Sequence, residues 1–279
     1  LQWNKTFAAT NISIGNSLDL SSDGGYIITG ETGTWCPFIG GNNYTYLLKT
    51  DFAGNLLWSG TYGYGFSGNP DEAGYSVQQT NDGGYVTAGK RIRTNYGTDY
   101  EAYIMKMNSS GTYQWSMVYG DSGNDAGNSV FQNTDGGYII AGVIDEWSAV
   151  QDMYLIKTDS NGSMLWNRTY DTGFQEHLAS VIQTSDGGFI SVGNTDGNPD
   201  DDILLMKFSS DGTLLWNNAF GGTKGDYAKC LKQTNDGGFI IAGYTQSFGT
   251  NIDAYLLKTD SSGNLQWSKI YGGTNWDRT

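Results

Sequence analysis

The sequence contains very little proline, cysteine and histidine: 3 Pro, 2 Cys and 1 His among 279 residues. Two thiols, Cys36 and Cys230, are too few for a disulfide scaffold or a four-thiolate zinc site, which leaves one disulfide or two free thiols. A Ser-His-Asp triad would have to use His177, and no G-x-S-x-G turn leads into a helix. We therefore expect His177 to be a loop residue.

Long apolar runs and net positive charge are missing as well. No stretch approaches the roughly 18 apolar residues that a membrane-spanning helix needs. The formal charge of −14 repels phosphate backbones and anionic lipid headgroups. We expect neither a nucleic-acid partner nor membrane insertion. No signal-like segment is present at Leu1, so the chain is interpreted as a mature protein or an excised segment.

What the chain does contain is glycine and aromatic residues. There are 41 Gly, and Phe, Trp and Tyr make up 14% of the sequence. This composition is typical of many short strands joined by glycine turns, because aromatic side chains suit a pleated surface and glycine suits tight turns. It predicts an all-β protein.

Two short motifs recur along the whole chain. Asp-Gly-Gly-Tyr/Phe begins at Asp23, Asp82, Asp135, Asp186 and Asp236, with spacings of 59, 53, 51 and 50 residues by subtraction. An apolar-x-Trp motif after a glycine turn supplies Trp58, Trp115, Trp166, Trp216 and Trp267. The period defines five repeats, at approximately 13–63, 72–120, 126–170, 177–221 and 227–273.

Each repeat reads as four short strands. In residues 228–273, two of the three connections are an Asp-Gly-Gly turn and an Asp-x-x-Gly turn, which favour tight antiparallel hairpins. One such sheet would leave an apolar face exposed to water, and radial stacking of copies covers that face. A β-helix needs shorter coils, and a sandwich does not explain the period. Residues 1–279 are therefore predicted to form a single five-bladed β-propeller of four-stranded antiparallel blades.

An Asp-x-x-Gly turn followed by a Trp-bearing strand occurs in Asp51–Trp58, Asp159–Trp166, Asp211–Trp216 and Asp260–Trp267, and more loosely in Asn108–Trp115. This pattern resembles the tryptophan-docking repeats of quinoprotein-type propellers. The resemblance implies a propeller fold. Quinoprotein dehydrogenases have eight blades and a vicinal cysteine pair near the quinone. This chain has five repeats and no Cys-Cys, so a quinone site is not expected.

An acidic residue stands just before the innermost strand of four repeats: Asp71, Asp125, Glu176 and Asp226. A ring of acids at the mouth of a central channel can hold a cation or accept hydrogen bonds from a sugar. The alternative is that each carboxylate caps backbone N–H groups of its own loop. The repeated Lys49, Lys106, Lys157, Lys207 and Lys258 are interpreted as exposed strand positions or structural ion pairs, and the repeated Trp residues as packing between blades.

Residues that break the repeat are further binding candidates. Trp35 and Trp147 fall in variable loops, where an aromatic ring either stacks on a sugar or anchors its own loop. Oxygen-bearing side chains alternate at Asn194, Asp196, Asn198, Asp200 and Asp202, a candidate calcium site. The stretch lacks the glycine and glutamate of an EF-hand loop, and the alternative interpretation is a solvated acidic turn. No cofactor is otherwise required.

The two ends carry nearly the same segment, because residues 1–11 match residues 265–275. Five four-stranded blades have 20 strand positions, and an extra N-terminal strand over residues 1–8 brings the number of predicted strands to 21. The surplus copy could pair with a neighbouring molecule and build a filament by strand exchange. The alternative is that the chain is a window cut from a longer repeat array.

These patterns predict a secreted or cell-surface propeller that self-assembles through its terminal strands. The alternative function is a lectin-like carbohydrate-binding module that uses its variable loops. Catalysis is not expected, because a glycosidase needs asymmetrically placed carboxylates and these acids follow the repeat. Glycosylation sequons occur at Asn4, Asn11, Asn43, Asn108, Asn161 and Asn167.

Overall fold

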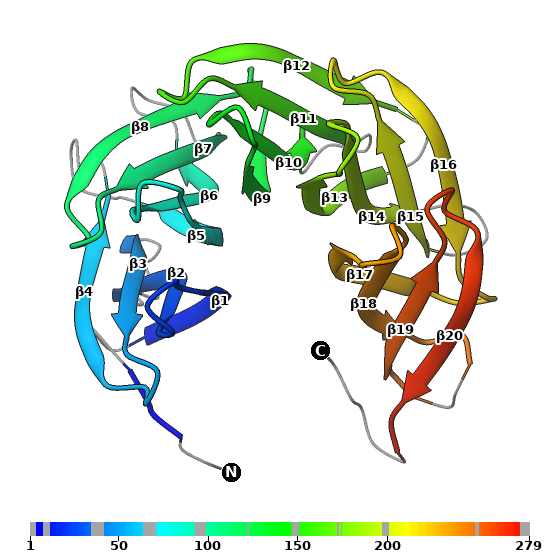
Figure 1. Cartoon of the computed structure of the whole chain (residues 1–279), viewed down its shortest axis with the longest axis horizontal. Helices are drawn as coiled ribbons and strands as arrows, with labels where there is room; N and C mark the ends of the chain where they lie inside the picture. The colour runs from blue at the N-terminus through cyan, green and yellow to red at the C-terminus, as the bar shows by residue number, and fades with distance from the viewer. Residues whose placement is uncertain are drawn as a thin grey trace. The chain divides into compact units, whose positions relative to one another are not determined.

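The computed structural model describes residues 4–7, 12–34, 42–63, 71–92, 99–121, 123–146, 151–171, 173, 175–196, 201–248 and 251–273. Twenty β-strands form five sheets, and no helix occurs within these ranges. Each sheet holds four strands that are consecutive in the chain (Figure 1). This confirms the predicted all-β fold, a β-propeller with five blades of four antiparallel strands. The described residues also contain no helix suited to crossing a membrane.

The blades follow one another along the chain. Blade 1 contains β1 (Ile12–Leu20), β2 (Tyr26–Thr34), β3 (Asn42–Thr50) and β4 (Leu56–Tyr62). Blade 2 contains β5 (Glu72–Gln79), β6 (Tyr85–Ile92), β7 (Tyr100–Met107) and β8 (Tyr113–Tyr119). Blade 3 contains β9 (Ala126–Gln132), β10 (Tyr138–Ile144), β11 (Asp152–Thr158) and β12 (Met164–Tyr170). Blade 4 contains β13 (Gln175–Gln183), β14 (Phe189–Asp196), β15 (Asp201–Phe208) and β16 (Leu214–Phe220). Blade 5 contains β17 (Asp226–Gln233), β18 (Phe239–Thr245), β19 (Asp253–Thr259) and β20 (Leu265–Tyr271).

The chain forms two compact units. The first consists of Leu1–Tyr138 and Thr158–Ser163 and includes blades 1 and 2. The second consists of Ile139–Lys157 and Met164–Thr279 and includes blades 4 and 5. Each unit has an apolar core between adjacent blades: Ile27 and Leu47 of blade 1 pack with Tyr103 of blade 2, and Ile190 of blade 4 packs with Phe239 of blade 5.

The two repeated motifs meet where one blade packs on the next. The ring of Trp166 on β12 lies against the Ser209–Gly212 turn of blade 4, the counterpart of the Asp-x-x-Gly turns, where a Cβ atom at Gly212 would be 2.9 Å from it. The same ring is 6.1 Å, centroid to centroid, from Phe189, the aromatic residue of the Asp-Gly-Gly-Phe motif. Equivalent contacts join Trp58 to Gly111 and Tyr85, and Trp115 to Gly162 and Tyr138. Trp58, Trp115 and Trp166 therefore pack between blades, as predicted, whereas Trp267 on β20 is 39% exposed.

The repeated lysines are buried and paired with the aspartate of the Asp-Gly-Gly turn. The side chain of Lys207 is 6% exposed, and its Nζ atom is 2.9 Å from Asp186 Oδ1. Asp186 Oδ1 also accepts a hydrogen bond from the backbone N–H of Gly188. The pairs Lys49–Asp23, Lys106–Asp82 and Lys258–Asp236 repeat this geometry. Of the two interpretations of these lysines, the structural ion pair holds for all four.

The two terminal copies of the repeated segment occupy different environments. The C-terminal copy forms β20, the fourth strand of blade 5. The strand predicted over residues 1–8 is not formed by residues 4–7, which belong to no sheet, because blade 1 already has four strands of its own. Lys5 Nζ donates to Asn55 Oδ1 at 3.2 Å, and Phe7 lines a cavity beside Tyr46 and Leu48. Residues 4–7 thus pack on blade 1.

Candidate ligand pocket

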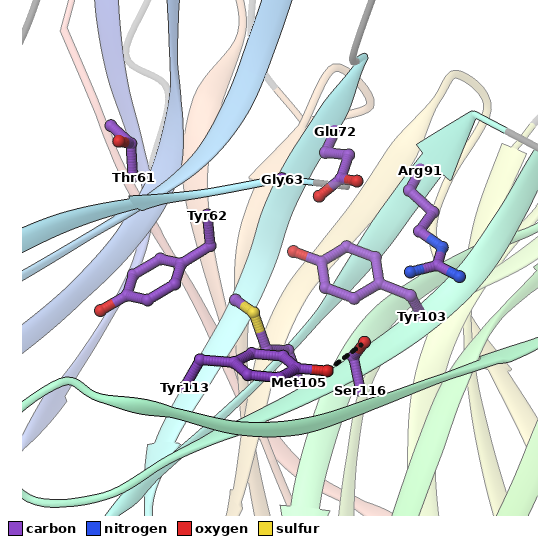
Figure 2. Close-up of a pocket in the computed structure, with 9 residues that line it drawn as sticks. All are labelled: Thr61, Tyr62, Gly63, Glu72, Arg91, Tyr103, Met105, Tyr113 and Ser116. Carbon is purple, nitrogen blue, oxygen red and sulfur yellow. Dashed lines mark hydrogen bonds between the residues drawn. The ribbon is translucent and has the colours of Figure 1, made fainter. Parts of the chain in front are cut away.

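A pocket of about 280 Å³ lies between blades 1 and 2, within the first unit (Figure 2). We call it the junction pocket. Its walls come from the end of β4 and from all four strands of blade 2, and its lining residues are Thr61, Tyr62, Gly63, Glu72, Arg91, Tyr103, Met105, Tyr113 and Ser116. It can take a small ligand, because binding pockets for small molecules begin at roughly 300 Å³.

Charged and hydroxyl groups gather at one side of the junction pocket. Glu72 on β5 and Arg91 on β6 are direct cross-strand neighbours, so their side chains project from the same face of the sheet. Figure 2 shows the Tyr103 ring between them and the pocket floor. Burial raises the pKa of Tyr103, whose hydroxyl is hydrogen-bonded to Thr45 Oγ1. This side of the pocket therefore offers a buried carboxylate and a guanidinium to a ligand.

Aromatic rings form much of the remaining wall. Tyr113 on β8 is 47% exposed, and its hydroxyl is 3.2 Å from Ser116 Oγ. Tyr62 lies opposite Tyr103 in Figure 2, and its hydroxyl donates to the carbonyl of Gly111 at 2.5 Å. Burial raises the pKa of Tyr62. Tyr62 is thus held in place by the fold, whereas the accessible ring of Tyr113 is free to contact a ligand.

Comparison among the five repeats separates structural from unusual residues in this pocket. Tyr103 has tyrosine counterparts at Tyr46, Tyr154 and Tyr255, so the repeat itself accounts for it. The positions equivalent to Arg91 hold Thr32, Ile144, Thr195 and Thr245. The positions equivalent to Tyr113 hold Leu56, Met164, Leu214 and Leu265. Since the other blades fold without them, Arg91 and Tyr113 are pocket residues that the repeat does not account for. A comparison of equivalent positions in the five repeats, which needs the sequence alone, would have identified both residues.

The predicted acids are placed at the start of the innermost strands. Asp125, Glu176 and Asp226 are fully buried. Asp125 Oδ2 accepts a hydrogen bond from the backbone N–H of Asp121 at 3.0 Å, and Asp226 Oδ2 accepts one from Gly222 at 2.8 Å. In these contacts a carboxylate caps a backbone N–H group of its own loop, as the alternative interpretation of these acids states. The contacts stabilise the loops whether or not the carboxylates also bind a ligand.

In blade 2 the residue in phase with these acids is Glu72, not Asp71. Glu72 pairs across the sheet with Arg91, as Glu176 pairs with Thr195 and Asp226 with Thr245. Asp71 precedes the strand and accepts hydrogen bonds from Asn43 Nδ2 and the Tyr100 hydroxyl. Burial, and then the nearby charge of Asp71, raise the pKa of Glu31.

The loop candidates fall largely outside the described residues. Trp35 and Trp147 lie there, as do Asn198 and Asp200 of the candidate calcium stretch. Asn194 is on β14, and Asp202 on β15 pairs with Thr195, so the side chains of Asn194 and Asp202 project from opposite faces of the sheet. One calcium ion cannot bind both, because successive strand residues point in opposite directions. Nothing in the described side chains of the stretch brings the remaining ligands together.

A different acidic group was not anticipated. Asp152, Asp171 and Glu176 of the second unit each place a carboxylate oxygen within 4.8 Å of the others. Burial, followed by the charges of Asp171 and Asp145, raises the pKa of Asp152. Asp171 follows β12 and Glu176 lies on β13, so blade packing rather than sequence spacing creates this group.

The sequons differ in accessibility. Asn4, Asn161 and Asn167 are exposed. Asn43 and Asn108 use their side chains in hydrogen bonds to Asp71 and Ser110, and Asn11 lies outside the described residues.

No protein-family model matches the chain, and no characterised protein matches it by sequence. Solved structures share its fold. A protein of unknown function from Dyadobacter fermentans is 12% identical with a TM-score of 0.64, covering 96% of this chain and 86% of that one. The WD40 domain of Pan2 from Neurospora crassa is 12% identical with a TM-score of 0.59, covering 93% and 66%. An endo-arabinase from Bacteroides thetaiotaomicron is 10% identical with a TM-score of 0.50, covering 98% and 100%.

These comparisons correct one sequence-based prediction. The chain was predicted not to be an enzyme, because its acids follow the repeat. That exclusion is wrong: the endo-arabinase has the same fold over its entire length, so a propeller of this size can carry an active site. A repeated acid that serves the fold in one blade can be recruited for chemistry in another. The chain thus shares its fold both with an enzyme and with a WD40 domain.

Proposed function

We propose that the protein binds carbohydrate in the junction pocket. The observation that carries the proposal is the pairing of an exposed aromatic ring, Tyr113, with the polar pair Glu72 and Arg91 in one pocket. A sugar ring has an apolar face of C–H groups that packs on an aromatic ring, and hydroxyl groups at its edge that hydrogen-bond to charged side chains. Arg91 and Tyr113 are also the pocket residues that the other blades do without.

The pocket dimensions limit the ligand. A volume of about 280 Å³ is at the lower end of the range for small-molecule sites. It suits one sugar residue held in the pocket, with the rest of an oligosaccharide extending over the exposed ring of Tyr113. A role in glycan recognition fits a protein outside the cell or at its surface, where the exposed sequon at Asn161 can be modified.

The test is a glycan array followed by calorimetric titration of the strongest ligand. Arabino-oligosaccharides belong on the array because an endo-arabinase shares the fold. We expect Tyr113→Leu and Arg91→Thr each to weaken binding about tenfold, the equivalent of about 1.4 kcal/mol. Both variants introduce the residue that other blades use, so the fold should be retained.

Phe52→Leu is the matched control, because Phe52 is also an exposed aromatic residue, 72% exposed against 47% for Tyr113, and lies in a turn of blade 1. Its affinity should equal that of the unmodified chain. Unchanged affinity in both pocket variants contradicts the proposal. Release of reducing ends from a bound oligosaccharide extends it from binding to hydrolysis.

A further inference from the structure

A second pocket lies in the other unit, between blades 4 and 5. We call it the polar pocket. Its volume is about 220 Å³, and every side chain that lines it is polar, including Gln151, Gln175, His177, Asn194, Asp201 and Tyr227. A surface gap between two β-sheets is ordinarily closed by apolar side chains, so a cavity whose lining residues all have hydrogen-bonding side chains favours an occupant with polar groups.

Asn194 supplies the strongest evidence for an occupant. Its side chain is 3% exposed, and its Nδ2 atom donates to the carbonyl of Asp226 at 2.8 Å. That bond fixes the amide, so Oδ1 is the atom left over, and among the described residues this buried oxygen has no hydrogen-bond donor. A buried acceptor without a donor is costly, and such atoms are usually satisfied by a ligand or by ordered water.

Two neighbouring groups are held in place around the same cavity. The Tyr227 hydroxyl donates to Asp201 Oδ2, and the Tyr227 ring stacks on Tyr244 with centroids 4.8 Å apart. Burial, and then the nearby charge of Lys229, lower the pKa of His177. The imidazole is therefore neutral at pH 7 and offers one donor and one acceptor. The pocket is rigid on this side and carries a single formal charge, that of Asp201.

The other repeats show that the fold does not need these groups. His177 was predicted to be a loop residue, but it lies within β13, where it is the cross-strand neighbour of Asn194 on β14. The equivalent pairs are Ile14 with Glu31 in blade 1, Ala73 with Lys90 in blade 2, and Tyr227 with Tyr244 in blade 5. Each blade has a different pair here, whereas the turn and tryptophan positions recur. These two positions are therefore open to a specific role.

We propose that the polar pocket binds a neutral, polyhydroxylated ligand, namely a single sugar residue, whose hydroxyl groups donate to Asn194 Oδ1 and to the carboxylate of Asp201. An anion is disfavoured because Asp201 lines the pocket and none of its described lining residues is a lysine or arginine. Near His177 the charge of Lys229 opposes those of Asp201 and Glu146, which weakens the attraction that the two acids alone would have for a cation. The volume suits one sugar ring. This site is separate from the junction pocket and does not depend on it.

The single histidine makes the test direct, because its ring gives the only imidazole signals in an NMR spectrum of the full-length chain. The chain is titrated separately with the methyl glycosides of glucose, galactose, mannose and arabinose. At least one should shift the His177 ring signals along a saturating curve. Asn194→Val, which introduces the residue of blade 3, and the isosteric Asp201→Asn should each weaken that binding about tenfold or more.

Asn217→Val is the matched control, an identical replacement at an exposed strand position of the same blade, and its titration should be unchanged. Tyr113→Leu should also leave the titration unchanged, which separates this site from the junction pocket. Thermal unfolding and a backbone amide spectrum with native dispersion report that each variant is folded. The proposal is overturned when no glycoside gives a saturating shift, when both polar-pocket variants bind with unchanged affinity, or when Tyr113→Leu abolishes the response.

Discussion

At the scale of single residues, a buried lysine on the third strand of a blade stabilises the Asp-Gly-Gly turn between the first two strands. Burial alone would raise the pKa of Asp186, but hydrogen bonds from Thr184 and Lys207 outweigh it and lower the pKa to about 2. Lys207 Nζ also donates to Thr184 Oγ1 at 2.8 Å. One ammonium group therefore ties β15 to the turn between β13 and β14. The Asp-Gly-Gly motif is thus half of an ion pair as well as a turn.

Replacing this lysine should change both stability and its pH dependence. Lys207→Met leaves buried acceptors without their donor, and we expect a loss of about 1–3 kcal/mol in the free energy of unfolding at pH 7. The folded-state pKa of Asp186 lies below its ordinary value of 3.8, so its stabilising contribution is complete above pH 3.8 and is lost as the pH falls through about 2. The variant should therefore lose less stability than the unmodified chain between pH 4 and 2.

Urea unfolding from pH 5 to 2 measures both effects. Lys232→Met is the control, because Lys232 is exposed on β17. Parallel pH profiles for Lys207→Met and the unmodified chain contradict the assigned role of Lys207.

At the scale of secondary-structure elements, the packing of one blade on the next depends on a glycine beneath each tryptophan. Gly212 and Gly187 of blade 4 have nearly equal φ values of +84° and +83°. A Cβ atom at Gly212 would be 2.9 Å from the Trp166 ring, whereas one at Gly187 would have no neighbour within 4 Å. Both turns need a residue with positive φ. Only the turn at Gly212 also needs a residue without a Cβ atom, because the Trp166 ring occupies that position.

This pair gives a differential prediction. Gly187→Ala should cost about 1 kcal/mol, the strain of a side chain in the left-handed region. Gly212→Ala should cost that amount and about 1–3 kcal/mol more, because the methyl group displaces Trp166. Thermal unfolding of both variants provides the comparison. Equal destabilisation would show that the Trp166 contact contributes nothing beyond the turn.

Elements were predictable from the sequence wherever the repeat is regular. The five blades, the role of the tryptophans and the lysine pairs all follow from residues spaced by a nearly constant period. The alignment of the repeats fails where the loops differ in length. The loop before β5 has no counterpart of equal length, and Asp71 was therefore predicted in place of Glu72 as the acid at the start of that strand. The inner strands also carry register shifts, such as that between Gly74 and Ser76, which sequence spacing does not reveal.

The pockets were less predictable for a related physical reason. Arg91 and Tyr113 are 22 residues apart by subtraction and lie on β6 and β8, so their meeting depends on sheet register and on the packing of β4 against blade 2. The acidic group of Asp152, Asp171 and Glu176 likewise joins two blades. A search for motifs finds residues that recur, and the residues that distinguish the junction pocket, Arg91 and Tyr113, do not recur.

At the scale of the whole molecule, the duplicated ends decide whether the chain acts alone or assembles. Residues 4–7 pack on blade 1 of their own chain through Lys5 and Phe7, and the C-terminal copy completes blade 5. Strand exchange into a filament remains a prediction. The packing of residues 4–7 on their own chain is compatible with it and does not test it. Both copies belong to the same repeat position, so each can interact with the same kind of surface.

Deleting residues 1–7 separates the two roles of the N-terminal copy. The deletion uncovers Tyr46 and Leu48 in the cavity beside Phe7, so we expect the free energy of unfolding to fall by about 1–2 kcal/mol, the value of half-burying one phenylalanine. Phe7→Ala in the full-length chain should account for most of that loss. Any polymer built by exchange of the terminal copies needs residues 1–7 and should be absent from the truncated protein in sedimentation experiments. A polymer of unchanged size after the deletion rules out strand exchange, whereas loss of the polymer in the deletion but not in Phe7→Ala assigns assembly to the strand itself and not to the stability it provides.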